Sequence, residues 1–133
     1  MNQKTEKKPS YWVFAEQRQG VLHDASLELV GAAAAIARQT SGSAVAVLLG
    51  QDIAGLADDL IVHGADRVLV VDDPRLAVYR LLPYASALKK LCRQEDPDVF
   101  LFGATSLGVE LAPRVAAMLQ TGLSAHCIDL KLD

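Results

Sequence analysis

Residues 97–133 read PDVFLFGATSLGVELAPRVAAMLQTGLSAHCIDLKLD, and the pattern of this stretch decides the fold. An apolar run predicts a buried strand at Val99–Gly103, and a glycine turn follows it from Gly103 to Gly108. After the turn, the pattern predicts a helix interrupted by Pro113 and a last strand at Ala125–Leu132. Glycine turns at the ends of strands are where α/β proteins usually bind nucleotides, so this stretch has the form of a nucleotide-binding fold.

The residues before this stretch alternate between strand-like and helix-like patterns. Apolar runs typical of strands that are buried on both faces lie at residues 11–15, 43–49 and 67–71. Helical patterns lie at residues 27–38, 53–63 and 75–93, and Pro83 can bend or divide the last of them. Strands that alternate with helices indicate βαβ units with right-handed crossovers. We predict a three-layer α/β/α fold with a doubly wound, mostly parallel sheet of about five strands in the order 3-2-1-4-5, of the adenine-nucleotide alpha hydrolase-like type.

Composition limits the classes of function. The 133 residues are expected to form one domain at residues 11–133, after a disordered tail at residues 1–10. The net charge of −3 provides no basic field for nucleic acid, and no apolar run reaches the ~18 residues of a membrane span. Cys92 and Cys127 form neither a C-x-x-C pair nor a zinc spacing, and we expect both to be small core residues. These features predict a cytoplasmic protein.

The glycine turn is the first candidate site. Gly103 to Gly108 has the G-x-x-x-x-G spacing of a phosphate loop, but Val109-Glu110 follows where such a loop needs Lys-Ser or Lys-Thr. Hydrolysis or phosphoryl transfer is therefore not expected. What is left is a helix N-terminus with the hydroxyls of Thr105 and Ser106, which can bind a neutral or weakly anionic group. The alternative is that one hydroxyl simply caps the helix.

The predicted strand order adds other candidate residues to this site. It places the end of the first strand, with Glu16, beside Gly103, Ala104, Thr105 and Ser106, which are the candidate cofactor-binding residues. Glu16 can accept a hydrogen bond from a ligand or partner, or it can cap a loop. Arg114 can reach a cofactor phosphate or a partner's carboxylate, or it can be solvated. No G-x-S-x-G elbow and no metal-ligand spacing occurs, so no catalytic or metal-binding residue is predicted.

These residues resemble a known family. FLFGATSLGVELAPRVAAMLQTGLSAHCIDLKL is similar to the end of the N-terminal domain of the electron transfer flavoprotein alpha subunit. WVFAEQRQGVLHDASLELVGAAAAIA and GADRVLVVDD are similar to the opening and the middle of the same domain, so the resemblance covers residues 11–133. One departure is His126, which stands where the family usually has an acidic residue.

The resemblance implies a function that the residues alone do not show. Alpha subunits of this family pair with a beta subunit and carry electrons by flavin adenine dinucleotide (FAD) from flavin dehydrogenases to a quinone reductase or another acceptor. A second domain holds most of the FAD contacts, and AMP is a possible ligand of the partner subunit. The resemblance therefore implies an electron carrier domain without turnover of its own, which would self-associate when it is alone. It implies that Gly103 to Ser106 and Arg114 lie nearest the cofactor or the partner.

A different function stays open at this point. A stand-alone adenine-nucleotide-binding module of the universal-stress type would use the same place in the same fold. That type needs a glycine-rich phosphate loop, and residues 106–110 (SLGVE) are poor for one.

Overall fold

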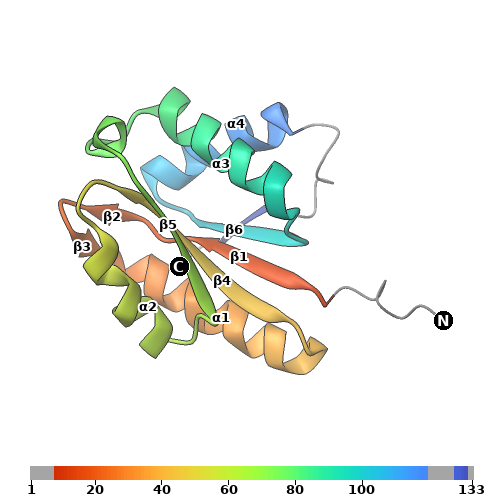
Figure 1. Ribbon diagram of the computed structural model, residues 1–133. Helices are drawn as coiled ribbons and strands as arrows, with labels where there is room; N and C mark the ends of the chain where they lie inside the picture. The colour runs from red at the N-terminus through yellow and green to blue at the C-terminus, as the bar shows by residue number, and fades with distance from the viewer. Residues whose placement is uncertain (1–7, 120–127, 132–133) are drawn as a thin grey trace.

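The computed structural model describes residues 8–119 and 128–131, which form one parallel sheet between two layers of helices (Figure 1). The sheet order is β5-β4-β1-β6-β7, and all neighbouring strands are parallel. Numbered along the chain, this is the predicted order 3-2-1-4-5, which is confirmed. The strands are β1 (Ser10–Phe14), β4 (Ser43–Gly50), β5 (Arg67–Asp72), β6 (Val99–Gly103) and β7 (Ile128–Lys131).

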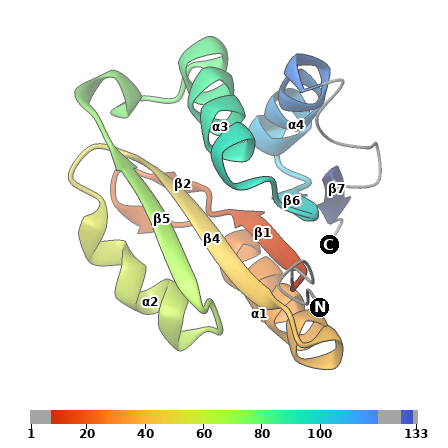
Figure 2. The ribbon, with the colours of Figure 1, turned by 45° about the vertical axis from the view of Figure 1, so that its right-hand side comes forward.

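Helices cover both faces of the sheet, as the three-layer prediction requires. One face carries α1 (Asp24–Thr40) and α2 (Ala57–Val62), and the opposite face carries α3 (Leu81–Glu95) and α4 (Ser106–Met118), as Figure 2 shows. Two short 3-10 helices, η2 (Ala54–Leu56) and η3 (Pro74–Leu76), follow β4 and β5.

The two faces of the sheet are packed by different kinds of side chain. Because side chains alternate along a strand, Trp12 and Phe14 of β1 point toward α3 and α4, whereas Val13 and Ala15 point toward α1. The first face is aromatic, and its rings form edge-to-face and stacked pairs that connect Trp12, Phe14, Tyr79, Tyr84, Phe100 and Phe102. The second face is built largely from small residues, among them Ala33, Ala34, Ala37, Ala44 and Ala46.

The prediction for Pro83 was partly wrong, and the prediction that Pro113 interrupts its helix was wrong. The helical pattern at residues 75–93 is divided as expected, but the division falls between η3 and α3, and Pro83 is the third residue of α3. In the first turn of a helix a missing N–H costs nothing, because no intrahelical acceptor is available there. Pro113 does not interrupt its helix, because α4 continues to Met118. Pro113 and Val109, whose carbonyl loses its intrahelical partner, are both exposed, so water can solvate that carbonyl.

Element boundaries also differ from the predictions. Ser10 belongs to β1 rather than to a tail, because it pairs with Ser43 of β4, and its N–H also donates to the Asp98 carboxylate at 2.8 Å. The helix predicted at residues 27–38 is longer at both ends, and His23 caps it. The last strand is described only as Ile128–Lys131, so Ala125, His126 and Cys127 lie outside the described residues, as does the tail at residues 1–7. Cys92 is buried on α3, as predicted.

Candidate functional site

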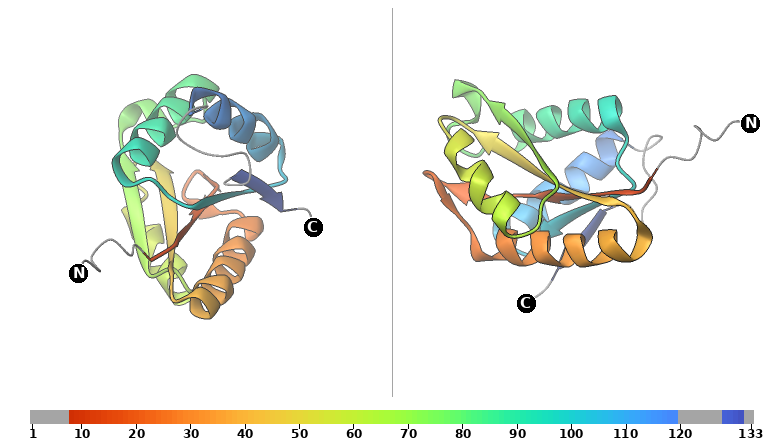
Figure 3. Two further views of the ribbon diagram at one scale, coloured as in Figure 1. Left: turned by 90° about the vertical axis from the view of Figure 1, so that its right-hand side faces the viewer. Right: turned by 60° about the horizontal axis from the view of Figure 1, so that its bottom comes forward.

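A cleft of about 1220 Å³ opens at the carboxyl ends of the strands. Three segments and Tyr84 of α3 line it; the segments are the chain after β1 (Glu16 to His23), the linker before α3 (Ala77 to Tyr79), and the first turns of α4 with the preceding Thr105. Figure 1 and the right-hand view of Figure 3 show the first two of these segments at the same end of the sheet. β1 and β6 are neighbours in the middle of the sheet, so this is the point where the strand order reverses and where α/β proteins place their ligands.

One wall of the cleft is a small hairpin that the sequence analysis did not predict. β2 (Gln17–Arg18) pairs antiparallel with β3 (Val21–Leu22). Gln19 and Gly20 have φ values of 53° and 82°, which is the pattern of a two-residue type I′ turn. The Gln17 amide Nε2 donates to the carbonyl of Leu49 at 3.1 Å, which ties the hairpin to β4. The signal in the sequence was the Gln19-Gly20 dipeptide between very short strands.

His23 also lines the cleft and caps α1. Its Nδ1 accepts a hydrogen bond from the backbone N–H of Ala25 at 3.0 Å. In the neutral imidazole this places the proton on Nε2, so the other nitrogen is a donor. This cap was not predicted from the sequence.

Thr105 connects the end of β1 to the beginning of α4. Its hydroxyl donates to Glu16 Oε1 at 2.7 Å, across 89 residues of sequence, and its oxygen accepts from the backbone N–H of Gly108 at 3.0 Å. The alternative in which a hydroxyl caps the helix is therefore confirmed for Thr105. Since the hydroxyl of Thr105 already donates its one proton in a hydrogen bond to the Glu16 carboxylate, Thr105 has no proton left to donate to a ligand.

Tyr79 holds a second carboxylate in the cleft. Its hydroxyl donates to Glu110 Oε1 at 2.7 Å, and its ring packs edge-on against Tyr84 with the ring centroids 5.0 Å apart. Burial, followed by the bond to Glu110, raises the pKa of the Tyr79 hydroxyl above its ordinary value, and the charge of Glu16 adds to this effect. Tyr79 therefore stays a neutral donor, and both carboxylates act on it. The sequence analysis noted Glu110 as a local charge but not its distant partner.

The two glycines of the turn serve packing. A Cβ on Gly108 would collide with the carbonyl of Gly103, so the first turn of α4 lies directly on the end of β6. A Cβ on Gly103 would lie 3.2 Å from the Cβ of Ala25 in α1. Close approach of the backbone to its own neighbours, rather than to a phosphate, explains both residues.

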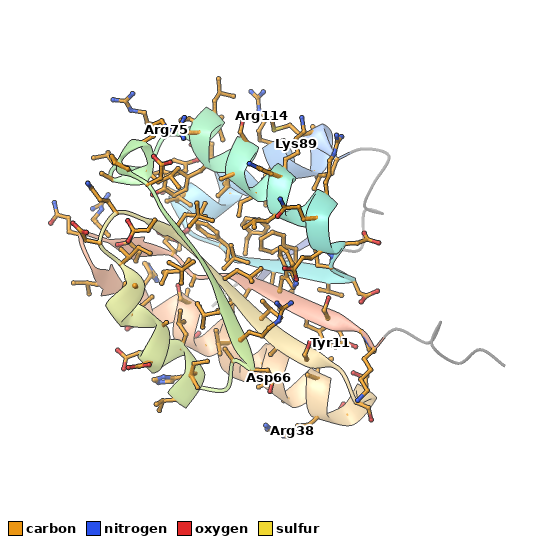
Figure 4. All side chains as sticks on the ribbon, in the orientation of Figure 1. Tyr11, Arg38, Asp66, Arg75, Lys89 and Arg114 are labelled. Atoms are coloured by element: carbon orange, nitrogen blue, oxygen red, sulfur yellow. The ribbon has the colours of Figure 1, made fainter. Side chains whose placement is uncertain are left out.

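The structure brings some of the predicted site residues together and separates others. Glu16, Thr105 and Ser106 line the cleft, whereas Gly103 and Ala104 do not. Arg114 is exposed on the outer side of the layer formed by α3 and α4 (Figure 4). It follows Ser106 by eight helical residues, which is about 12 Å along α4. A role for Gly103, Ala104, Thr105, Ser106 or Arg114 in binding a cofactor stays a prediction.

The charges of the cleft do not fit the pyrophosphate of FAD. Glu16 and Glu110 contribute two carboxylates, against the single guanidinium of Arg18. Within residues 8–119 and 128–131, no three His, Cys, Asp or Glu side chains are grouped so that they could hold a metal ion. No helix in the same part of the chain is long and apolar enough to cross a lipid bilayer.

Comparison with known proteins shows the family. Residues 11–133 match the electron transfer flavoprotein domain. The chain belongs to the electron transfer flavoprotein family. Over 122 residues it is 44% identical to the electron transfer flavoprotein subunit alpha of Thermoanaerobacterium thermosaccharolyticum, which covers 92% of this chain and 37% of that protein. The corresponding protein of Megasphaera elsdenii is 45% identical, with 92% and 36% covered.

A third relative has a more specialised name. The acryloyl-CoA reductase electron transfer subunit beta of Anaerotignum propionicum is 41% identical over 122 residues, which is 92% of this chain and 33% of that protein. The chain thus spans about a third of the length of these relatives. The resemblance of residues 11–133 to this flavoprotein family is confirmed.

Substituting the glycine of the turn tests its packing role. We expect Gly108→Ala to lower the free energy of unfolding by about 3 kcal/mol, because the new methyl group meets backbone that cannot move aside. Gly31→Ala is the matched control, since a Cβ there meets nothing within 4 Å, and it should raise stability by about 1 kcal/mol. Urea unfolding measures both, and a Gly108→Ala variant as stable as the wild type would contradict the packing role.

Removing the hydroxyl of Thr105 tests the connection between β1 and α4. Thr105→Ala should cost about 1–2 kcal/mol of unfolding free energy, because the cap of α4 is lost and Glu16 loses its donor. Thr105→Ser keeps the hydroxyl and should retain most of the stability. Equal losses in the two variants, measured by thermal and urea unfolding, would show that the methyl group matters rather than the hydroxyl.

The raised pKa of Tyr79 predicts a loss of stability in alkali. Below about pH 10 the tyrosine is protonated in both states, whereas above it the unfolded chain releases a proton that the folded protein retains. The free energy of unfolding should therefore fall as the pH rises above about 10. In the Tyr79→Phe variant this fall should be shallower, while Tyr84, whose pKa burial also raises, still contributes. Identical slopes in both proteins would refute the assignment.

Proposed function

We propose that this chain acts as the N-terminal domain of an electron transfer flavoprotein alpha subunit, which pairs with a beta subunit. In that assembly it supports FAD-mediated electron transfer from dehydrogenases to a respiratory or other acceptor. The observation that carries the proposal is the family match over residues 11–133, together with 44% and 45% identity to relatives that are named alpha subunits. The Anaerotignum relative, named as an electron transfer subunit of acryloyl-CoA reductase, indicates that donors and acceptors differ between members.

The domain has no turnover of its own in this proposal and contributes a rigid scaffold. FAD supplies the electron chemistry and is held mainly outside this chain, and AMP is a ligand only of the partner subunit. Two features support this division. Glu16 and Glu110 make the cleft at the switch point unsuitable for a pyrophosphate, and the hydroxyl of Thr105 is already bonded to Glu16 and Gly108.

The partners and the location follow from the same proposal. The beta subunit is the direct partner, and flavin dehydrogenases and a quinone reductase interact with the assembled protein. The assembly works in the cytoplasm. Arg114 is exposed on α4 and is therefore better placed for a partner's carboxylate than for a cofactor bound in the cleft. Without the partner, exposed apolar residues such as Val21 and Val78 favour self-association.

The test is to combine the chain with the electron transfer flavoprotein beta subunit of the same organism. Size-exclusion chromatography with light scattering should show a one-to-one complex, because the family's domain is expected to be covered by that subunit. Calorimetric titration of the chain alone with FAD should show no binding, since the cleft carries two carboxylates.

Titration of the chain alone with AMP is the control for the other function. Binding of AMP at micromolar concentration, without association with the beta subunit, would contradict the proposal. That result would favour the stand-alone nucleotide module of the universal-stress type.

A further inference from the structure

We propose that the cleft at the carboxyl end of the sheet, together with its apolar rim, is the surface that receives the beta subunit. Its occupant is a polypeptide segment of that subunit that places an arginine or lysine side chain between Glu16 and Glu110. This inference rests on the proposed function and specifies which face of the domain makes the contact and by what chemistry.

The rim of the cleft exposes apolar side chains from two separate segments. Val21 of the hairpin and Val78 of the linker before α3 both line the cleft and are 69% and 70% exposed. Val109, in the first turn of α4 next to Glu110, is 51% exposed. Val21 and Val78 lie at one opening and contribute little to the core of this domain, and Val109 adds exposed apolar surface on the helix that carries Glu110. Exposed apolar side chains beside one opening are typical of a surface that another protein covers.

The charges inside the rim determine the chemistry of the occupant. Glu16 and Glu110 each accept a hydrogen bond from a neutral hydroxyl, of Thr105 and Tyr79, which fixes the carboxylate but leaves its negative charge. The two ion pairs of the described residues lie elsewhere, at Arg67–Glu95 and Arg75–Asp73. Arg18 supplies one positive charge against these two carboxylates, so the cleft stays net negative and its field is complementary to a positive group and opposed to a phosphate.

An arginine or lysine of a protein segment matches this surface better than a small cation does. The cleft of about 1220 Å³ is far larger than one ion needs, and its open rim presents apolar area that a free cation would leave exposed. A guanidinium has five donors in a planar fork, so one arginine can bond to carboxylates on two sides. The side chains flanking it on the segment would be apolar and would cover Val21, Val78 and Val109.

A second groove beside the cleft carries positive charge and therefore provides a control surface for the experiment. It measures about 800 Å³ and lies between the end of β5, η3 and α3, where Arg80 and Lys90 contribute positive charge. Val78 lines both hollows and therefore forms the ridge between them. A basic segment of the partner would lie in the acidic cleft and avoid this groove.

The test measures binding of the beta subunit to variants of the cleft by calorimetry at two salt concentrations. Glu110→Lys and Val78→Lys should each weaken binding by about tenfold or more, because one inverts a charge at the centre and the other adds to the apolar rim a charge of the same sign as the incoming segment. Val62→Lys on α2 is the matched control for Val78→Lys, since Val62 is 80% exposed but lies outside the cleft. The control should change the dissociation constant by less than about twofold.

A double variant separates charge from folding. Glu16→Gln with Glu110→Gln keeps an acceptor for both hydroxyl donors and removes only the charges. It should melt like the wild type, bind the beta subunit more weakly, and lose most of the salt dependence of the dissociation constant. Lys90→Gln in the second groove should not weaken binding.

The outcomes distinguish this inference from the proposed function. If the wild type binds the beta subunit and all cleft variants bind equally well, the docking surface is wrong while the proposed function stands. Equal losses in Val62→Lys and Val78→Lys overturn the docking surface as well, because the effect is then not specific to the cleft. If the wild-type chain binds no beta subunit, both proposals fall.

Discussion

The contact between the first turn of α4 and the end of β6 is the constraint on which the cleft depends. Gly108 lies against the carbonyl of Gly103 with no room for a Cβ, and this sets the position at which α4 begins. Thr105 sits inside that turn, where its hydroxyl caps the helix and holds Glu16. One backbone contact thereby fixes a helix terminus, a strand end and a carboxylate.

On the aromatic side of the sheet, a chain of packed rings leads from the core to a carboxylate at the surface. Phe14 of β1 packs on Tyr84, Tyr84 packs edge-on against Tyr79, and Tyr79 donates to Glu110. Tyr84 is fixed in turn by its hydroxyl, which donates to the carbonyl of Leu76 at 2.7 Å. The position of an exposed carboxylate is therefore determined by ring packing that begins in the core. A rigid array of this kind presents a charge to a partner with little loss of side-chain entropy on binding.

Features of the fold and the site that depend on neighbouring residues could be predicted from the sequence, whereas contacts between residues far apart in the sequence could not. The five strands could be predicted because each is an apolar run that is visible in the local sequence. Their order could be predicted because right-handed crossovers leave few possible topologies. The hairpin at Gln17–Leu22 was missed because strands of two residues carry no periodicity. The bonds between Glu16 and Thr105, and between Tyr79 and Glu110, join residues 89 and 31 positions apart, so no local pattern indicates them. The prediction that Pro113 interrupts its helix was wrong because a proline within a helix is tolerated where the carbonyl that loses its hydrogen bond is exposed to water.

The cleft shows how a nucleotide-binding fold can keep the shape of its site and lose the chemistry. A phosphate at this position would need donors at the start of α4, but Thr105 directs its only proton to a carboxylate. If the Thr105 hydroxyl donated to a phosphate instead, the Glu16 carboxylate would lose its hydrogen-bond donor. It would then lie beside the negatively charged phosphate, with the Glu110 carboxylate in the same cleft. Each carboxylate therefore blocks the anion that the fold would otherwise receive and creates a field that attracts a cation instead. Because the hydroxyl bonds fix both carboxylates before any partner arrives, that field exists in the free domain. A positively charged segment would thus be attracted before it makes contact, and association would be fastest at low ionic strength.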